Sequence, residues 1–253
     1  MSVKIGPWSG KKYFLDKMNL SDLVVAYFTH YAIMSYLVLA AIMIGLTVMW
    51  ADNVWGPLLA VAVVIPVYPL VWYLLHRFVL HGSFLYKSPL TAALWKRIHF
   101  DHHQDPNDLG VLFGALTTTL PTVVLVIMPI GWLIGGPAGA TAGVAWGLLT
   151  TCYYEFCHCI QHLPFSPKNS FLKRIKKLHL AHHFHSEKGN YGITNYLWDK
   201  VFGTYYSQPK AFPRSDTVHN LGYVNEVTRR YPWVAEISDL DISNPRVHRA
   251  NAG

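Results

Sequence analysis

Charged side chains are scarce in this sequence of 253 residues. Asp, Glu, Lys and Arg together make up 14% of it, against 52% hydrophobic residues. Because about a quarter of the residues of a soluble globular domain are charged, this shortage excludes an ordinary water-soluble globule. Nine Trp and fifteen Tyr add amphipathic aromatic side chains, which favour membrane interfaces. The composition therefore predicts an integral membrane protein.

Cysteine is also rare. Cys152, Cys157 and Cys159 are the only three, and they lie within eight positions of one another. They are too close together to frame a disulfide scaffold, and so few thiolates argue against a soft-metal cluster. We interpret them as small residues of an apolar helix. Because the first twenty residues are polar and mixed, we expect no cleavable signal peptide.

The net charge of +7 raises the question of a nucleic-acid partner. The basic residues, however, gather in the N-terminal twenty residues, around Lys96 and Arg97, and from Lys168 to Lys177. These groups flank apolar runs, so the expected counterpart is the anionic headgroups of lipids and not nucleic acid.

Four apolar runs reach the roughly twenty residues that a helix needs to cross a bilayer. They lie near 24–50, 55–75, 110–134 and 138–157, and the short links ADNV and GGPA join them in two pairs. The predicted fold is all-α: four transmembrane helices in two hairpins, with a cytoplasmic helical cap. We divide the chain into a cytoplasmic N-terminal segment (1–23), a membrane-embedded domain (24–205) and a cytoplasmic C-terminal cap and tail (206–253).

The distribution of basic residues predicts the orientation. The N-terminus, the segment 76–109 and the residues after 158 hold nearly all Lys and Arg, whereas the two links hold none. The positive-inside rule then places both termini and the middle segment in the cytoplasm, consistent with an even number of spans.

Histidine is abundant in this sequence, although charged residues are scarce. Ten of the fourteen histidines fall into four boxes, HRFVLH, HFDHH, HCIQH and HLAHH. In a helix, residues three and four apart share a face, so we expect the members of each of the last three boxes to converge on a common centre. The arrangement of a helical hairpin, a histidine pair and a histidine triplet occurs twice, offset by about eighty residues.

The box HRFVLH does not fit a regular helix, because His76 and His81 would lie about 140° apart on it. Three explanations remain open from the sequence. The helix ends near Gly82, a π-type turn brings the pair together, or the two histidines approach the centre from different sides.

A lone histidine at a membrane boundary needs no special explanation, but ten without compensation would be costly there. Metal binding compensates directly, since neutral imidazole is the commonest side-chain ligand. Ten imidazoles exceed the needs of one ion and give two ions about five each, which predicts a dinuclear site. Imidazole suits iron, and two irons with open positions imply dioxygen chemistry. For Asp101 and Glu155 we favour roles in orienting the histidines over direct ligation.

The four boxes after helical hairpins resemble the integral-membrane fatty acid hydroxylase superfamily, which includes the sterol desaturases. HFDHHQDPNDLG and HLAHHFHSEKGNYGITNYLWDKVFGTYY are similar to segments of fatty acid 2-hydroxylases, and the resemblance covers roughly Leu74 to Tyr205. It implies two iron ions (Fe2+/Fe3+), dioxygen as co-substrate and electrons from a donor. The implied ligands are His76, His81, His99, His102, His103, His158, His162, His179, His182 and His183. His185 falls outside the pattern.

Only about twenty residues precede the first predicted span, which leaves no room for the fused cytochrome domain of eukaryotic 2-hydroxylases. We therefore expect electrons from a separate protein, a cytochrome or a ferredoxin with its reductase. The leading hypothesis is a membrane monooxygenase that hydroxylates a fatty acyl chain at the 2-position, in a bacterial inner membrane or the ER. The alternatives are a desaturase, or a hydroxylase of a sterol or carotenoid, with the same centre. A metal transporter or a haem electron carrier is a more distant alternative.

Overall fold

The computed structural model describes residue 8 and residues 11–238, and within them every element is helical. The one β contact is an isolated bridge between Phe14 and Asp108. The elements are η2 (Leu15–Lys17), α1 (Leu20–Phe28), α2 (Tyr31–Trp50), α3 (Trp55–Leu74), η3 (Leu75–Leu80), α4 (Pro89–Trp95), η4 (Lys96–Phe100), α5 (Asp101–Gln104), α6 (Leu109–Leu112), α7 (Leu116–His162), α8 (Ser170–Phe184), α9 (Leu197–Val201), η5 (Pro209–Ala211), α10 (Glu226–Arg230) and α11 (Trp233–Glu236). The predicted all-α fold is confirmed for these residues.

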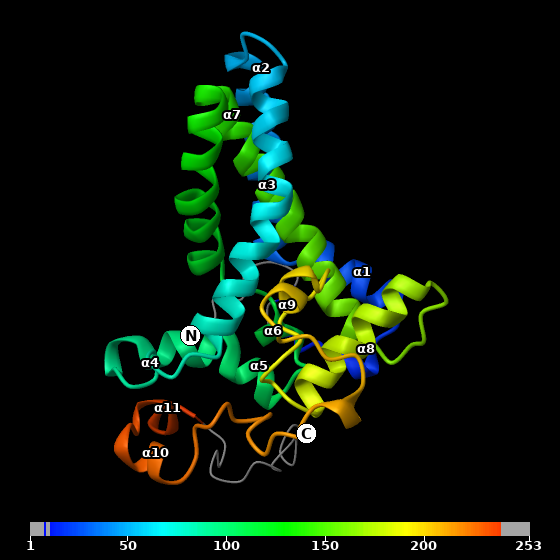
Figure 1. Cartoon of the computed structure of the whole chain (residues 1–253), viewed down its shortest axis with the longest axis vertical. Coiled ribbons are helices and arrows are strands. Elements are labelled where there is room, and N and C mark those ends of the chain that lie inside the picture. The colour runs from blue at the N-terminus through cyan, green and yellow to red at the C-terminus, as the bar shows by residue number, and fades with distance from the viewer. Residues whose placement is uncertain (1–7, 9–10, 239–253) are drawn as a thin grey trace.

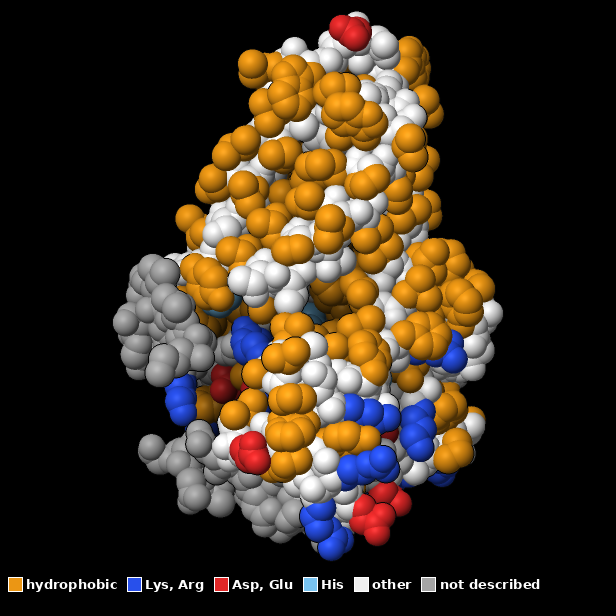
Figure 2. Space-filling model, turned by 90° about the vertical axis from the view of Figure 1, so that its left-hand side faces the viewer, with side chains coloured by type: hydrophobic (Ala, Val, Ile, Leu, Met, Phe, Trp, Pro, Cys, Tyr) orange, Lys and Arg blue, Asp and Glu red, His pale blue; other side chains and the backbone are white. Residues whose placement is uncertain are grey.

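Three helical stretches are long and apolar enough to cross a membrane: Tyr31–Trp50, Trp55–Leu80 and Leu109–His162. They form the column in the upper part of Figure 1. Large apolar side chains point outward from it, for example Val48 and Leu133, which are 75% and 86% exposed. Hydrophobic side chains also cover this part of the face in Figure 2, while Lys and Arg gather at the lower end. An outward-facing apolar column is what a bilayer requires.

Helix α7 is two antiparallel arms joined by a sharp bend. Gly135 and Gly136 have non-helical backbone angles, and the φ of +58° at Gly136 is one that L side chains rarely adopt. The arms pack tightly beside the bend, since a Cβ at Gly131 would lie 2.3 Å from the carbonyl oxygen of Gly139. The link GGPA, predicted to join two helices, is therefore the site of this bend.

The first long helix is shorter than predicted. A helix over 24–50 was expected, but the chain breaks at Thr29 and His30, so that α1 ends at Phe28 and α2 begins at Tyr31. His30 is extended, buried and stacked on Phe113, with ring centroids 4.2 Å apart. A polar ring held against a neighbouring loop ends the helix, which an apolar run alone does not reveal.

The shorter elements gather at the lower end of the column in Figure 1. A small second core of Trp95, Phe100, Tyr223 and Val234 joins α4 and η4 to the C-terminal segment. Residues 239–253, the end of the predicted cap and tail, and residues 1–7, 9 and 10 of the N-terminal segment lie outside the described residues.

Candidate metal centre

Two π-helical turns shape the first two histidine boxes. In η3 the N–H of His81 donates to the carbonyl oxygen of His76, five residues earlier, at 3.1 Å. The wider turn brings these two rings to a centroid distance of 4.9 Å. Of the three explanations open for HRFVLH, the π-type turn is thus the one the chain adopts. A second π turn, η4, ends within HFDHH, since it contains His99 and Phe100, and it was not predicted.

The ten predicted histidines all meet, but in two groups and not at one centre. Within each group, one ring nitrogen from every member lies within 4.8 Å of the others. Group A is His76, His81, His99, His103 and His182, and group B is His102, His158, His162, His179 and His183.

The two triplets exchange their middle members. His99 and His103 stay with the preceding pair of group A, while His102 from the same turn joins group B. In the same way, His182 leaves its own triplet and joins group A. The twofold arrangement noticed in the sequence is therefore an interlocked pair of sites, each built from both halves of the chain.

Several nitrogens within a group are at distances that suit ligands of one ion. The Nε2 atoms of His81 and His99 are 2.9 Å apart in group A. In group B, the corresponding distance is 3.0 Å for His102 and His158 and 2.9 Å for His162 and His179. Two ligand nitrogens bound about 2.1 Å from a common ion lie about 3 Å apart when they subtend roughly 90°.

Backbone carbonyls fix three of the imidazole rings. Nδ1–H of His76 donates to the carbonyl oxygen of Tyr191 at 2.6 Å, and Nδ1–H of His182 donates to that of Gly189 at 2.8 Å. Nδ1–H of His103 donates to the carbonyl oxygen of Val218 at 2.7 Å. A carbonyl oxygen can only accept, so Nδ1 carries the proton and Nε2 keeps its lone pair for a ligand.

Asp199 anchors the loop that supplies two of these carbonyls. The side chain is fully buried and accepts from the backbone N–H groups of Tyr191 and Gly192, both at 2.8 Å. It also accepts from the hydroxyl of Thr204 at 2.8 Å. Burial raises the pKa of Asp199, and these hydrogen bonds counter the rise. Asp199 lies in the WD…FGT segment, but the sequence alone did not predict that it holds this loop.

The donor set fits metal ions. Nine of the ten histidines are buried, and His81 is partly buried. The Nε2 atoms of His76, His103 and His182 are enclosed without a hydrogen-bond partner in the described chain. Burial lowers the pKa of His103 and His182 from 6.5 to about 3, so both rings are neutral at physiological pH. Clustered neutral imidazoles with enclosed lone pairs are costly unless a cation binds them.

The two carboxylates that were expected to orient histidines have other partners in the structure. Asp101 pairs with Lys96 at 2.7 Å, and Glu155 accepts from the backbone N–H of Gly114 at 3.1 Å. Within the described chain, neither forms a hydrogen bond to a histidine ring; carbonyl groups take the role expected of them. Lys96 binds both oxygens of Asp101, whereas Oε2 of Glu155 is buried without a hydrogen-bond partner among the described residues. His185 belongs to neither group and donates through Nε2–H to the carbonyl oxygen of Phe212.

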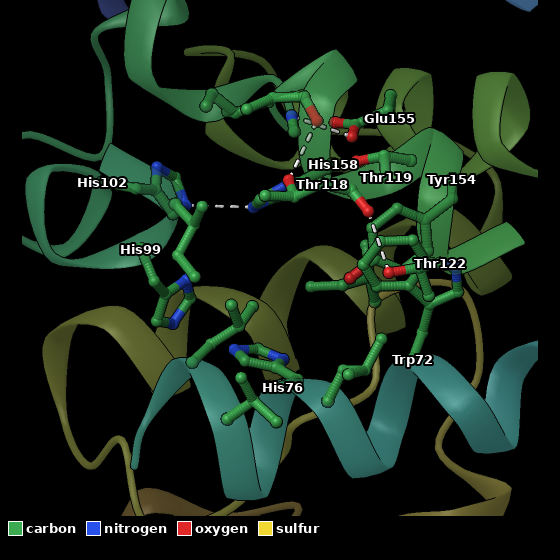
Figure 3. Close-up of a pocket in the computed structure, with 18 of the residues that line it drawn as sticks. Trp72, His76, His99, His102, Thr118, Thr119, Thr122, Tyr154, Glu155 and His158 are labelled. Carbon is green, nitrogen blue, oxygen red and sulfur yellow. Dashed lines mark hydrogen bonds between the residues drawn. The ribbon is translucent and has the colours of Figure 1, made fainter. Parts of the chain in front are cut away.

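A cavity of about 200 Å³ reaches both groups. His76, His99, His102 and His158 line one part of it (Figure 3), together with His179. The remaining wall is mostly apolar, with a polar strip formed by Thr118, Thr119, Thr122 and Glu155. An apolar cavity that ends at paired histidine groups can hold an alkyl chain against a metal centre.

Comparisons with known proteins agree on one family, the fatty acid hydroxylases. The family model for fatty acid hydroxylase matches residues 61–204. A dihydroceramide fatty acyl 2-hydroxylase of Arabidopsis thaliana is 35% identical over 155 residues, which cover 58% of this chain and 60% of that protein. A ceramide very long chain fatty acid hydroxylase of Saccharomyces cerevisiae is 34% identical over 146 residues, 55% of this chain and 36% of that protein.

Among solved structures, full-length scs7p, in which only the hydroxylase domain is visible, has a TM-score of 0.63 and 26% identity. The match covers 78% of this chain and 73% of that one. The chain thus spans from about a third to three fifths of the length of the curated relatives named above. The family match covers more than half of the chain and contains all ten histidines of the two groups, and the chain therefore belongs to the fatty acid hydroxylase family.

Proposed function

We propose that this chain is a membrane-bound di-iron monooxygenase that hydroxylates a fatty acyl chain at the 2-position, with dioxygen and electrons from a separate donor. The observation that carries the proposal is the pair of five-histidine groups at the end of one apolar cavity. Several relatives are named as 2-hydroxylases of fatty acyl chains, which supports the choice of reaction and position.

We assign four membrane crossings to the column: α2, α3 and the two arms of α7. Both links, at 51–54 and at Gly135–Gly136, then lie on the side opposite the histidine groups. The basic residues of the lower end face the cytoplasm under the positive-inside rule. The metal centre lies at the cytoplasmic boundary of an inner or ER membrane, where an acyl chain enters directly from the bilayer.

Two iron ions would be held by groups A and B, one by each set of five histidines. When bound, the irons supply the activation of dioxygen that an unactivated C–H bond requires. The chain's own residues hold the substrate and exclude water. Apolar side chains such as Leu112 and Ile98 line the cavity beside the histidines, and positioning of one carbon against the centre decides where the hydroxyl is placed.

The electrons come from a separate protein, a cytochrome or a ferredoxin with its reductase. One face of α8 supports this assignment. Lys173, Arg174 and Lys177 are exposed on it, while His179, His182 and His183 lie buried on the same helix. A basic face close to the centre suits an acidic electron carrier.

The same centre could remove two hydrogens from the chain or oxidise a sterol, and the histidines alone do not separate these outcomes. A transporter would place ionisable groups along a path through the membrane. Here they gather at one end of the column, and a haem needs one or two axial histidines, not ten.

Lipid mass spectrometry of cells with and without the chain tests the proposal. We expect acyl chains that gain one oxygen at the 2-position, and no gain in cells that express His179→Ala. His185→Ala is the matched control and should retain activity. Acyl chains that lose two hydrogens and gain no oxygen would contradict the proposed hydroxylation and indicate a desaturase instead.

A further inference from the structure

A second cavity of about 120 Å³ lies next to the first. It is lined mainly by Ile65, Tyr68 and Pro69 of α3, by Thr150 and Tyr153 of α7, and by the loop residues Thr194 and Asn195. None of these seven residues lines the first cavity. The second cavity is lined by no member of either histidine group, although Tyr191, whose carbonyl oxygen accepts from His76, is part of its lining.

Three residues line both cavities: Trp72, Tyr154 and Ile193. The rings of Trp72 and Tyr154 stack at a centroid distance of 5.7 Å and an interplanar angle of 24°. One comes from α3 and the other from the second arm of α7, so the stacked pair closes the space between these two helices. Together with the buried loop residue Ile193, the stacked pair forms the wall between the two cavities.

The wall lies opposite His99 and His102, although the ring centroid of Tyr154 is 6.3 Å from that of His158 on the same arm of α7. In Figure 3, His99 and His102 are on one side of the first cavity, while Trp72 and Tyr154 are on the opposite side. An acyl chain whose second carbon is held at the histidines would extend across the cavity toward this pair. The stacked rings of Trp72 and Tyr154 then limit the length of the acyl chain that fits in the first cavity.

We propose that the second cavity receives the methyl end of long acyl chains and that the Trp72–Tyr154 stack sets the chain-length limit. This inference rests on the proposed acyl hydroxylation. Both rings are half-buried, and a stacked aromatic pair contributes only about 0.5–1.5 kcal/mol beyond its buried area, so side-chain rotation can join the cavities. The proposed ligand of the second cavity is the end of a hydrocarbon tail, packed mainly against the aromatic rings that line it, while Thr150, Thr194 and Asn195 add polar groups to the lining.

The test compares hydroxylated with unmodified acyl chains at every chain length in cells that express each variant. Trp72→Ala joins the two cavities and should raise the hydroxylated fraction of the longest chains at least about tenfold relative to the shorter ones, the discrimination that one methylene gives in an apolar pocket. Thr150→Trp fills the second cavity only, and it should shift the products toward shorter chains. Trp132→Ala, at an outward side chain that is 57% exposed, is the matched control.

An unchanged chain-length profile in both Trp72→Ala and Thr150→Trp, with hydroxylation intact, would overturn the proposal. If Trp72→Ala does not accumulate, Thr150→Trp alone decides, because it leaves the wall in place. Absence of hydroxylated chains in cells with the unmodified protein would instead refute the proposed function. The two failures are therefore distinguishable.

Discussion

At the scale of single residues, the centre depends on how each histidine is oriented. His102 and His182 each lie one residue before a histidine of the opposite group, and this offset turns them toward different centres. The carbonyl oxygens of Gly189 and Tyr191 then hold His182 and His76 in one tautomer. These carbonyls belong to a loop whose conformation depends on one buried carboxylate, Asp199.

Asp199→Ala should lower the metal content of group A. The change leaves the N–H groups of Tyr191 and Gly192 without an acceptor, at about 1–3 kcal/mol each, and frees the carbonyls that orient His76 and His182. We expect bound iron to fall toward one ion per chain, measured by elemental analysis of purified protein. Asp52→Ala, at the distant link, is the control; two ions retained in Asp199→Ala would contradict this role.

His179→Ala and His185→Ala should differ although both remove one imidazole of the same segment. His179 is a buried member of group B, whereas His185 binds the carbonyl of Phe212. We expect His179→Ala to lose metal and activity and His185→Ala to retain near-normal metal. Equal loss in the two variants would refute the exclusion of His185.

At the scale of elements, the apolar runs and the histidine spacing were sufficient to predict the helices of the column and the ten histidines that gather in the two groups. The spacing could not predict which triplet member joins which group, because that depends on η4 and on loops distant in sequence. The orienting carbonyls were also not predictable, since any residue supplies a carbonyl. The break at His30 depends on stacking with Phe113, which periodicity does not record.

The bend in α7 gives a test of element packing. A Cβ in Gly139→Ala would lie 2.4 Å from the carbonyl oxygen of Gly131, so the two arms would have to separate. We expect a lower Tm in detergent. Gly45→Ala in α2 meets nothing within 4 Å and should raise the stability slightly, by up to about 1 kcal/mol from helix propensity. Equal effects of the two substitutions would contradict close packing of the arms.

At the scale of the whole molecule, an apolar column carries a polar end in which two interlocked metal groups join the halves of the chain. The two histidine groups are thus a structural link between the halves of the chain as well as the proposed reaction site. Each group draws on segments on both sides of α7's bend, so metal binding should stabilise the whole fold.

Stability should fall in acid once the metal is removed. In the folded chain the pKa of His103 and of His182 is about 3, against 6.5 ordinarily, so the unfolded chain binds protons that the folded chain does not. The contribution is full above pH 6.5 and is lost as the pH falls from 6.5 toward 3, at about 1.4 kcal/mol per pH unit for each histidine. Thermal melts of metal-depleted protein from pH 7.5 to 5 measure it; a constant Tm would contradict it.

The most direct test of the central claim is the number of iron ions bound per chain in the purified protein. Iron determined by elemental analysis, with the protein quantified by amino-acid analysis, gives this ratio. Two groups of five neutral imidazoles predict two irons per chain and no haem spectrum. One iron, one haem or a load that varies between preparations would contradict the dinuclear centre.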